Sequence, residues 1–203
     1  MKKSDFDPKH QNQTTESKIV ASLEKISQAF RVLLWQESRE YSLSPIQVQV
    51  LIFLLHHSEE KRKVSYLAGE CNMTKATISD TVKALDQKGL IEKAYEPNDT
   101  RSYVIHLTER GREMAEKTSH FTRELHTPID KLHADDKENL LLSLLNIIRH
   151  LNRAGVITVP RMCMTCTYYR SSENGQKHFC KLLNQHLQVT DLRIDCPEHK
   201  LKV

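Results

Sequence analysis

The sequence predicts a mainly α-helical protein with one small two-stranded β-ribbon and a separate cysteine-rich module at its C-terminal end. Glycine and proline are scarce, at 5 and 6 of 203 residues, and apolar residues recur at helical spacing in several long segments. Four of the five cysteines lie between residues 163 and 196. We therefore divide the chain into a disordered arm at 1–14, a main domain at 15–155 and a cysteine-rich tail at 156–203.

The composition limits the class of protein. The 30 Lys and Arg against 26 Asp and Glu give a net charge of only +4, so binding to nucleic acid would depend on the local placement of charge. No apolar run is long enough for a signal peptide or a membrane span. We expect a cytoplasmic protein with no membrane partner. Because the sequence contains neither a Gly-rich phosphate loop nor a nucleophile constellation, we expect no enzyme.

The first two helices of the main domain follow from the spacing of apolar residues. Residues 1–14 are polar and show no period, which predicts disorder. From Ser17 to Ser38 apolar residues recur at helical spacing and predict one long helix. Ser44 and Pro45 then supply a cap and a first-turn proline for a second helix. Apolar residues lie nearly all round this second helix, so we expect it to be central and buried.

A short helix, a turn and a longer helix are predicted between residues 64 and 89. The short helix spans Ser65–Cys71, and Asn72 suits the turn because its side chain tolerates the left-handed conformation. The longer helix spans Thr74–Lys88, with Thr74 as its cap and Gly89 as its stop. One apolar stripe along it consists of Ile78, Val82 and Leu85.

The side of the longer helix that faces away from this stripe carries short polar side chains and one lysine. Such side chains can approach the edges of DNA bases, and a helix-turn-helix places the N-terminal part of its second helix in the major groove. An ordinary amphipathic surface helix would show the same pattern. The candidate DNA-binding residues of this segment are Thr74, Lys75, Ala76, Thr77, Ser79, Asp80, Lys83 and Gln87.

A two-stranded ribbon is predicted next, with strands at 90–95 and 103–107. The polar loop Glu96–Arg101 between the strands contains good turn residues. A cation at the tip of a protruding hairpin is placed to reach a phosphate or the minor groove. Asp99 and Arg101 are therefore further candidates for DNA binding, and the alternative is a solvated ion pair between them.

Several blocks of this sequence occur in the order of a known family of regulators. They are Thr77-Ile78-Ser79, Val82, Leu85, Lys88-Gly89-Leu90-Ile91-Glu92, Asp99-x-Arg101 and Leu107-Thr108-x-x-Gly111. In these blocks the chain resembles the MarR family of bacterial winged-helix regulators, and the resemblance covers roughly 17–154. It implies a winged helix-turn-helix that binds double-stranded DNA as a homodimer. It also implies a repressor or activator, often one that responds to small phenolic ligands or oxidants.

Two positions depart from the family pattern. The family often has arginine at the position of Asp80, and an aspartate there repels phosphate but can accept a hydrogen bond from cytosine N4. We therefore expect a different base preference. Some members carry a second arginine directly after the wing-tip arginine, where this chain has Ser102 and Tyr103, so we expect a weaker contribution from the wing.

Two more helices complete the predicted main domain. Thr108 caps a helix whose apolar side extends to Leu125, and Asp135 or Asp136 opens a last long helix that ends at Gly155. This much apolar helix surface exceeds the need of a small winged core. We expect the first helix and the last two to meet a second copy of the chain, as the resemblance also implies, and the alternative is a monomer core. Two recognition helices about 34 Å apart would then require a pseudo-palindromic DNA site.

The cysteines of the tail have the spacing of a four-thiolate site. Cys163 and Cys166 form a Cys-x2-Cys knuckle, and Cys180 and Cys196 follow after thirteen and fifteen residues. Metal binding would supply the stability that a small polar segment lacks. We place Zn²⁺ slightly ahead of a 4Fe-4S cluster, which one knuckle plus two single cysteines also suits. Loose reduced cysteines are the alternative.

Three histidines of the tail and Cys71 are the remaining residues that could bind a metal. His178, His186 and His199 are spare candidates for the metal, but surface histidines are the simpler interpretation. Cys71 is interpreted as a small buried apolar residue of the short helix.

Together these patterns predict a DNA-binding transcription regulator, expected to be a repressor. We expect it to be gated by a small-molecule effector or by the redox or metal state of the tail. The alternative is a metal-centre redox protein or adaptor that uses the winged fold to dock other proteins.

Overall fold

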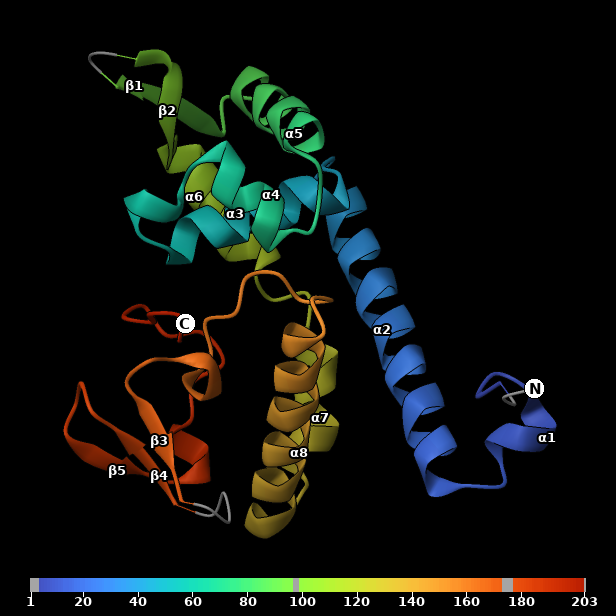
Figure 1. Cartoon of the computed structure of the whole chain (residues 1–203). Helices are drawn as coiled ribbons and strands as arrows, with labels where there is room; N and C mark the ends of the chain where they lie inside the picture. Colours follow the sequence, from blue (N-terminus) through green and yellow to red (C-terminus); the bar gives the residue numbers. More distant parts are fainter. Residues whose placement is uncertain (1–3, 97–98, 173–176, 203) are drawn as a thin grey trace.

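The computed structural model describes residues 4–96, 99–172 and 177–202, with side chains outside the segment 96–101. Figure 1 shows a winged-helix domain, a long helix α2 that leads into it, and a helix α8 that lies beside a small C-terminal module. Within the described ranges no helix is long and apolar enough to cross a membrane.

The N-terminal part departs from the expected disordered arm. A four-residue helix, α1 (Pro8–Gln11), begins where the side chain of Asp7 accepts a hydrogen bond from the amide of Lys9. The aspartate followed by proline is a local start signal that apolar periodicity does not detect. The hydroxyl of Ser17 donates to Asp5, at 2.7 Å between Oγ and Oδ1, and so holds this segment against α2 (Thr15–Glu40). The long helix is confirmed, with two more residues at each end than predicted.

The core of the winged domain forms around α3 (Pro45–His56), which is buried as expected. The cap is a complete capping box between Ser44 and Gln47, with the predicted proline in the first turn. Around α3 lie α4 (Val64–Glu70), α5 (Lys75–Gln87), the wing and α6 (Glu109–Thr118). The fully buried side chains of this core include Val50, Leu51, Leu54, Leu67, Ile78, Val82, Leu85, Ile105 and Ala115.

The wing is an antiparallel pair of strands, β1 (Ile91–Glu96) and β2 (Asp99–Leu107), in which Ile91 faces Leu107. The second strand begins four residues earlier than predicted. The amide of Ile105 donates to the carbonyl of Arg62, at 3.0 Å between N and O, in the segment after the short 3-10 helix η1 (Glu59–Lys61). The base of the wing is therefore attached to the segment that leads into α4.

The start of α6 packs directly on the start of the wing. Thr108 is the predicted cap: its hydroxyl accepts from the amide of Gly111 at 3.0 Å and donates to the carbonyl of Gly89 at 2.8 Å. A Cβ atom on Gly111 would lie 1.8 Å from the carbonyl oxygen of Leu90, so only glycine fits there. Gly89 itself has φ +67°, which explains its position after α5.

The last two predicted helices need correction. The helix from Thr108 to Leu125 is interrupted: α6 ends at Thr118 and α7 spans Arg123–Asp130. The hydroxyls of Thr118 and Ser119 donate to carbonyls of the last turn of α6, and such bonds compete with continued helix. The next helix, α8 (Ala134–Arg153), is preceded by His133, whose side chain makes no capping bond. Asp135 and Asp136 lie in its first turn instead of capping it, and Gly155 ends it with φ +73°.

The C-terminal module is a three-stranded antiparallel sheet with two short helical turns. The strands β3 (Tyr169–Ser171), β4 (His178–Cys180) and β5 (Gln185–Leu187) follow one another in the sheet. The turn η2 (Cys163–Thr165) precedes the sheet and η3 (Val189–Asp191) follows it. A small core joins the module to α8 and consists of Leu145, Met162, Leu187 and Leu192. Apolar packing against α8 therefore stabilises the module.

Candidate nucleic-acid interface and cysteine cluster

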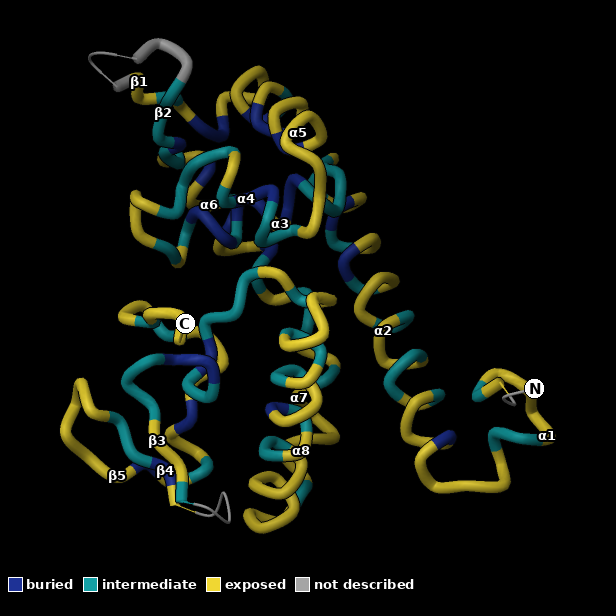
Figure 2. Tube along the Cα trace, viewed as in Figure 1, coloured by how far each residue is buried: buried dark blue, intermediate teal, exposed yellow. Residues whose placement is uncertain are grey.

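The helix α5 has two chemically distinct sides. Ile78, Val82 and Leu85 are fully buried against the domain core. All eight predicted residues of this segment are exposed on the other side: Thr74, Lys75, Ala76, Thr77, Ser79, Asp80, Lys83 and Gln87. Figure 2 shows the exposed side of α5 at the surface of the winged domain. The helix is therefore held by its apolar stripe and presents short polar side chains, with two lysines, to solvent.

The turn before α5 has the geometry that the sequence predicts. Asn72 adopts φ +50°, in the left-handed region. The hydroxyl oxygen of Thr74 accepts from the amide of Thr77 at 3.1 Å, and the two threonine hydroxyl oxygens lie 2.9 Å apart. These hydrogen bonds cap the N-terminal end of α5.

An ion pair fixes the wing relative to α5. Lys93 Nζ in β1 lies 2.7 Å from Asp86 Oδ2 in the last turn of α5. This hydrogen bond is the main reason that the pKa of Lys93 is raised above its ordinary value. The helix and the ribbon therefore form one surface.

The sequence did not predict a hollow that lies between the wing and the helix-turn-helix. It has a volume of about 220 Å³ and is lined by Lys63, Val64, Ser65, Lys75, Ser102 and Tyr103. In the segment before α4 the guanidinium of Arg62 donates to the carbonyl of His57, at 2.7 Å between Nε and O. Only the fold brings the start of α4 to the second wing strand, so no local pattern could have identified this hollow.

Two of the predicted DNA-binding residues, Asp99 and Arg101, belong to the tip of the wing. The backbones of Asp99 and Arg101 belong to β2, but their side chains lie outside the described part of the chain. Their role in DNA binding stays a prediction from sequence.

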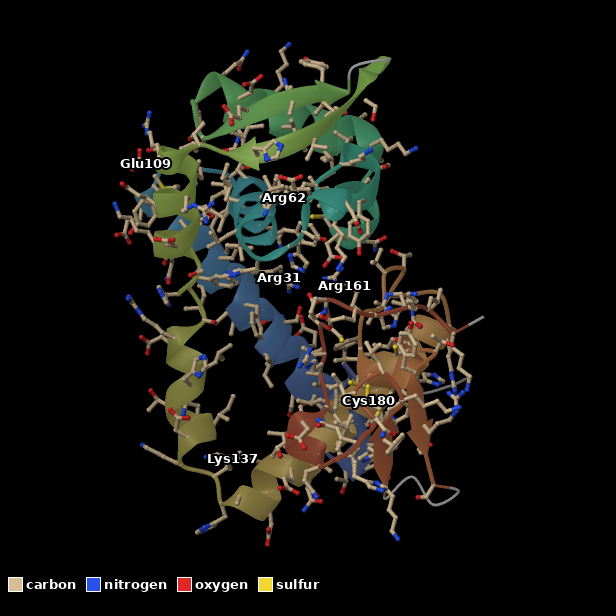
Figure 3. All side chains as sticks on the ribbon, turned by 90° about the vertical axis from the view of Figure 1, so that its left-hand side faces the viewer. Arg31, Arg62, Glu109, Lys137, Arg161 and Cys180 are labelled. Carbon is tan, nitrogen blue, oxygen red and sulfur yellow. The ribbon has the colours of Figure 1, made fainter. Side chains whose placement is uncertain are left out.

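The cysteines of the tail lie together. Cys163, Cys180 and Cys196 line one cavity of about 350 Å³, although they come from η2, β4 and the segment after η3. Cys166 is attached to Cys163 by the turn η2, in which its amide donates to the carbonyl of Cys163 at 2.9 Å. Burial raises the pKa of the Cys163 thiol, and the nearby thiols of Cys196, Cys180 and Cys166 raise it further. Figure 3 shows further sulfur atoms beside the labelled Cys180.

The surroundings of these sulfur atoms include hydrogen-bond donors. The amide of Arg193 donates to Cys163 Sγ at 3.2 Å, and its guanidinium lies 3.9 Å from Cys196 Sγ. All five cysteines are free thiols. Among the residues that the structure describes, no group of three or more His, Cys, Asp or Glu side chains has the arrangement that holds a single metal ion.

The three spare histidines differ from one another. His178 is only 3% exposed, so the prediction of a surface residue is wrong for it. Its Nδ1 lies 2.6 Å from the hydroxyl of Tyr169, and its buried Nε2 has no hydrogen-bond partner among the described residues. Burial lowers the pKa of His178. His186 is exposed, and His199 Nε2 lies 3.0 Å from the hydroxyl of Thr165.

Arg161 joins the cysteine module to the helix-turn-helix, and Figure 3 shows it at this junction. Its guanidinium donates to both carboxylate oxygens of Glu70, the last residue of α4, and lies over the ring of Phe53 in α3, with 5.5 Å from Cζ to the ring centre. It also donates to both oxygens of Asp195, at 2.6 Å each. Asp195 directly precedes Cys196, so one side chain connects a cysteine-bearing segment to α4.

Neighbouring contacts reinforce this junction. His57 Nε2 lies 2.9 Å from Asp195 Oδ2, and the hydroxyl of Thr158 donates to the carbonyl of Gly69 at 3.0 Å. The hydrogen bonds from Arg161 lower the pKa of Asp195 to about 2. Sequence reasoning missed Arg161, because its partners lie 34 and 91 positions away.

Cys71 lies apart from the cluster, at the C-terminal end of α4. Its side chain is partly buried against the core of the winged domain. Burial raises the pKa of its thiol to about 11, and Glu70 adds to the shift.

Known proteins resemble the winged domain. Residues 41–102 match the model of the MarR family. The chain is 26% identical over 106 residues to the HTH-type transcriptional regulator BilQ of Clostridioides difficile (strain CD3), which covers 51% of this chain and 72% of that protein. It is 32% identical over 68 residues to the uncharacterized HTH-type transcriptional regulator YdgJ of Bacillus subtilis (strain 168), which covers 34% of this chain and 41% of that protein.

The fold has a counterpart among solved structures. The crystal structure of an S. aureus MepR–DNA complex superposes with a TM-score of 0.57 at 23% identity, over 65% of this chain and 97% of that chain. At this identity the likeness shows the fold. The family match and the structural likeness both fall on the winged domain. The family match ends at residue 102 and so does not include the cysteine module.

Proposed function

We propose that this chain is a MarR-type transcription regulator that binds double-stranded DNA as a homodimer and acts as a repressor. The observation that carries the proposal is the pair of faces on α5: a fully buried apolar stripe and, opposite it, eight exposed residues next to a wing. A helix fixed in this way can enter a major groove without disturbing its own core. Such a regulator works where the DNA lies, in the cytoplasm.

The exposed apolar surface of α2 supports the homodimer. Ile19, Ile26 and Phe30 lie on one side of this helix and are 49%, 47% and 40% exposed. Figure 2 shows that α2 is exposed along most of its length. On α8, Leu140 and Ile147 are 43% and 38% exposed, one heptad apart. A second copy of the chain would cover these stripes, and two-fold pairing is the commonest way to do so.

A two-fold dimer would determine the form of the DNA site. Its two α5 helices would enter successive major grooves about 34 Å apart, so the site is a pseudo-palindrome with half-sites about 10 base pairs apart. Occupation of such a site within a promoter would exclude polymerase, and this is the mode of repression that we propose. A ligand that favours a different spacing would release the DNA. A small-molecule effector stays a prediction without an assigned site.

Two lysine variants test the proposal. Lys83→Ala removes a cation from the exposed face of α5, and Lys137→Ala removes one from the first turns of α8, which Figure 3 shows at the end of the molecule away from the wing. Affinity is measured by fluorescence anisotropy on duplexes selected from a random library, at several salt concentrations. We expect Lys83→Ala to cost about 1–3 kcal/mol of binding free energy and Lys137→Ala to leave it unchanged.

A variant in the wing is the second test of the proposal. Arg101→Ala should lower the slope of log K against log salt by about one, because a phosphate contact is lost. If wild type binds no duplex in preference to competitor, the regulator proposal fails and a docking module becomes the better explanation. Equal losses in Lys83→Ala and Lys137→Ala would show that α5 is not the binding face.

A further inference from the structure

We propose that the cavity lined by Cys163, Cys180 and Cys196 binds a 4Fe-4S cluster, with Cys166 as the fourth ligand, and that Arg161 transmits its binding to α4. The second half of this proposal rests on the proposed DNA-binding function. The first half does not, since it concerns only the chemistry of the module.

The donor set fits such a cluster. Three thiols from three separate segments face the same cavity, and the fourth belongs to the same tight turn as the first. Four cysteine thiolates are the usual ligands of a cubane iron–sulfur cluster. Binding replaces four S–H bonds by four S–Fe bonds and releases four protons, so no oxidant is needed at the protein.

The spacing of the possible ligands favours a cluster over a single ion. A tetrahedral zinc ion brings its four sulfur atoms into mutual contact. Within the described ranges, no three candidate side chains have the close arrangement of a one-ion site. A cubane core occupies space between its ligands and holds their sulfur atoms farther apart.

The surroundings also suit bound sulfur. The amide of Arg193 already donates to Cys163 Sγ at 3.2 Å, and hydrogen bonds of this kind stabilise the negative charge of a cluster and its thiolates. Leu187 and Leu192 are buried and form an apolar part of the cavity lining, whereas Leu182 and Leu183 are 47% and 51% exposed. The guanidinium of Arg193 lies 3.9 Å from Cys196 Sγ, and its positive charge offsets that of Glu198, with which it pairs at 3.6 Å and to which Cys196 Sγ donates at 3.6 Å.

A short path leads from this cavity to the helix-turn-helix. Cys196 follows Asp195, whose two carboxylate oxygens accept hydrogen bonds from Arg161. Arg161 also donates to both oxygens of Glu70 at the C-terminal end of α4. The amide of Cys196 donates to the carbonyl of Arg161 at 2.9 Å, so a backbone hydrogen bond also joins these two residues. A change in the position of Cys196 on cluster binding would therefore reach α4.

The cluster is tested on the full-length chain without air. The purified protein is reconstituted with ferric iron, sulfide and a thiol reductant, and then desalted. We expect broad absorption near about 400 nm and about four iron and four sulfide per chain. Zinc bound at one per chain in place of iron, or no retained iron, would overturn the cluster.

Cysteine variants identify the ligands. Serine replacement of Cys163, Cys166, Cys180 or Cys196 should abolish or bleach the absorption, and Cys71→Ser is the matched control that should keep it. Circular dichroism records whether each variant is folded. If a variant of the four is unfolded, the iron content of wild type still decides the question. Full absorption in a folded Cys180→Ser or Cys196→Ser protein would overturn the assignment of ligands.

The coupling is tested by DNA affinity before and after a chelator strips the iron. We expect a change of at least fivefold in wild type, which is a typical size for coupling between two sites. Arg161→Gln should reduce this ratio to about one while it keeps the absorption. Arg170→Gln is the control, because Arg170 is an exposed arginine of the module that donates only to carbonyls of Thr167 and Tyr169 among the described residues.

The outcomes separate the two proposals. A cluster with unchanged DNA affinity overturns the coupling, as does an undiminished ratio in Arg161→Gln. If no duplex binds in either state, the regulator function fails, and the spectra and iron content still decide the cluster.

Discussion

Arg161 and Glu70 face each other across the junction between the cysteine module and the helix-turn-helix, with 3.1 Å between Nη2 and Oε1. The side chain of Arg161 is only 9% exposed and that of Glu70 is 24% exposed. Such a pair is shielded from water, unlike most surface ion pairs. The junction is therefore a specific contact, and it is the feature that distinguishes this chain from a winged domain with a loosely attached tail.

Removal of one partner of this pair should destabilise the fold. We expect Glu70→Ala to lower the free energy of unfolding by about 1–2 kcal/mol, because Asp195 still balances the buried guanidinium. The measurement is urea unfolding followed by circular dichroism. Glu113→Ala is the control: it breaks an exposed pair with Lys117, 3.9 Å from Oε2 to Nζ, and should cost less than about 0.5 kcal/mol. Equal effects in the two variants would refute a structural role for the junction.

Gly111 should tolerate no side chain. In Gly111→Ala the new Cβ would meet the Leu90 carbonyl oxygen at 1.8 Å, and since this is backbone, α6 must move away from the wing. We expect a loss of at least about 2 kcal/mol in unfolding free energy. Gly155→Ala provides the comparison, because φ is +73° there but nothing lies within 4 Å of an added Cβ. It should cost about 1 kcal/mol, and a larger loss there than at Gly111 would contradict the described packing.

The thiol of Cys71 should be unreactive in the folded protein. Burial raises its pKa to about 11 from an ordinary value of 9.0, and only the thiolate reacts with iodoacetamide. At pH 8 the folded chain then holds about a hundredfold less thiolate at this position than the chain in urea. The rate should rise about tenfold per pH unit up to pH about 11. Mass spectrometry of the Cys71 peptide measures it, and equal rates in folded and unfolded protein would disprove the burial.

The exposed stripe of α2 should hold the dimer together. Phe30→Glu places a charge on the apolar side that carries Ile19 and Ile26, and we expect it to shift the protein from dimer to monomer. Sedimentation velocity measures the change. Arg31→Glu is the neighbouring control on the same helix, and its effect should be small because Arg31 is an exposed residue off the stripe. A wild-type monomer would end the dimer proposal at once.

Local signals were sufficient for much of the winged domain. The cap at Thr74, the left-handed Asn72 and the stop at Gly89 all lie within a few residues of what they control, and each is confirmed. The two faces of α5 follow from the helical period alone. The prediction failed where side chains compete with the backbone, as at Thr118 and Ser119, which end α6 early.

Long-range contacts explain what the sequence did not predict. The Cys-x2-Cys knuckle is a local pattern, whereas the cavity also needs Cys180 and Cys196, which only the fold of the module brings to it. His178 was interpreted as a surface residue because a single histidine in a short strand shows no sign of what covers it. The part played by Arg161 likewise depends on residues from α3, α4 and the C-terminal segment.

Selection of duplexes from a random library is the most direct test of the central claim, that α5 and the wing form the DNA-binding face of a symmetric dimer. We expect the bound sequences to share one inverted repeat with half-sites about 10 base pairs apart. Binding should be lost when five base pairs are inserted between the half-sites. Sequences without a shared repeat, or a single half-site that binds as tightly as the full repeat, would contradict the account.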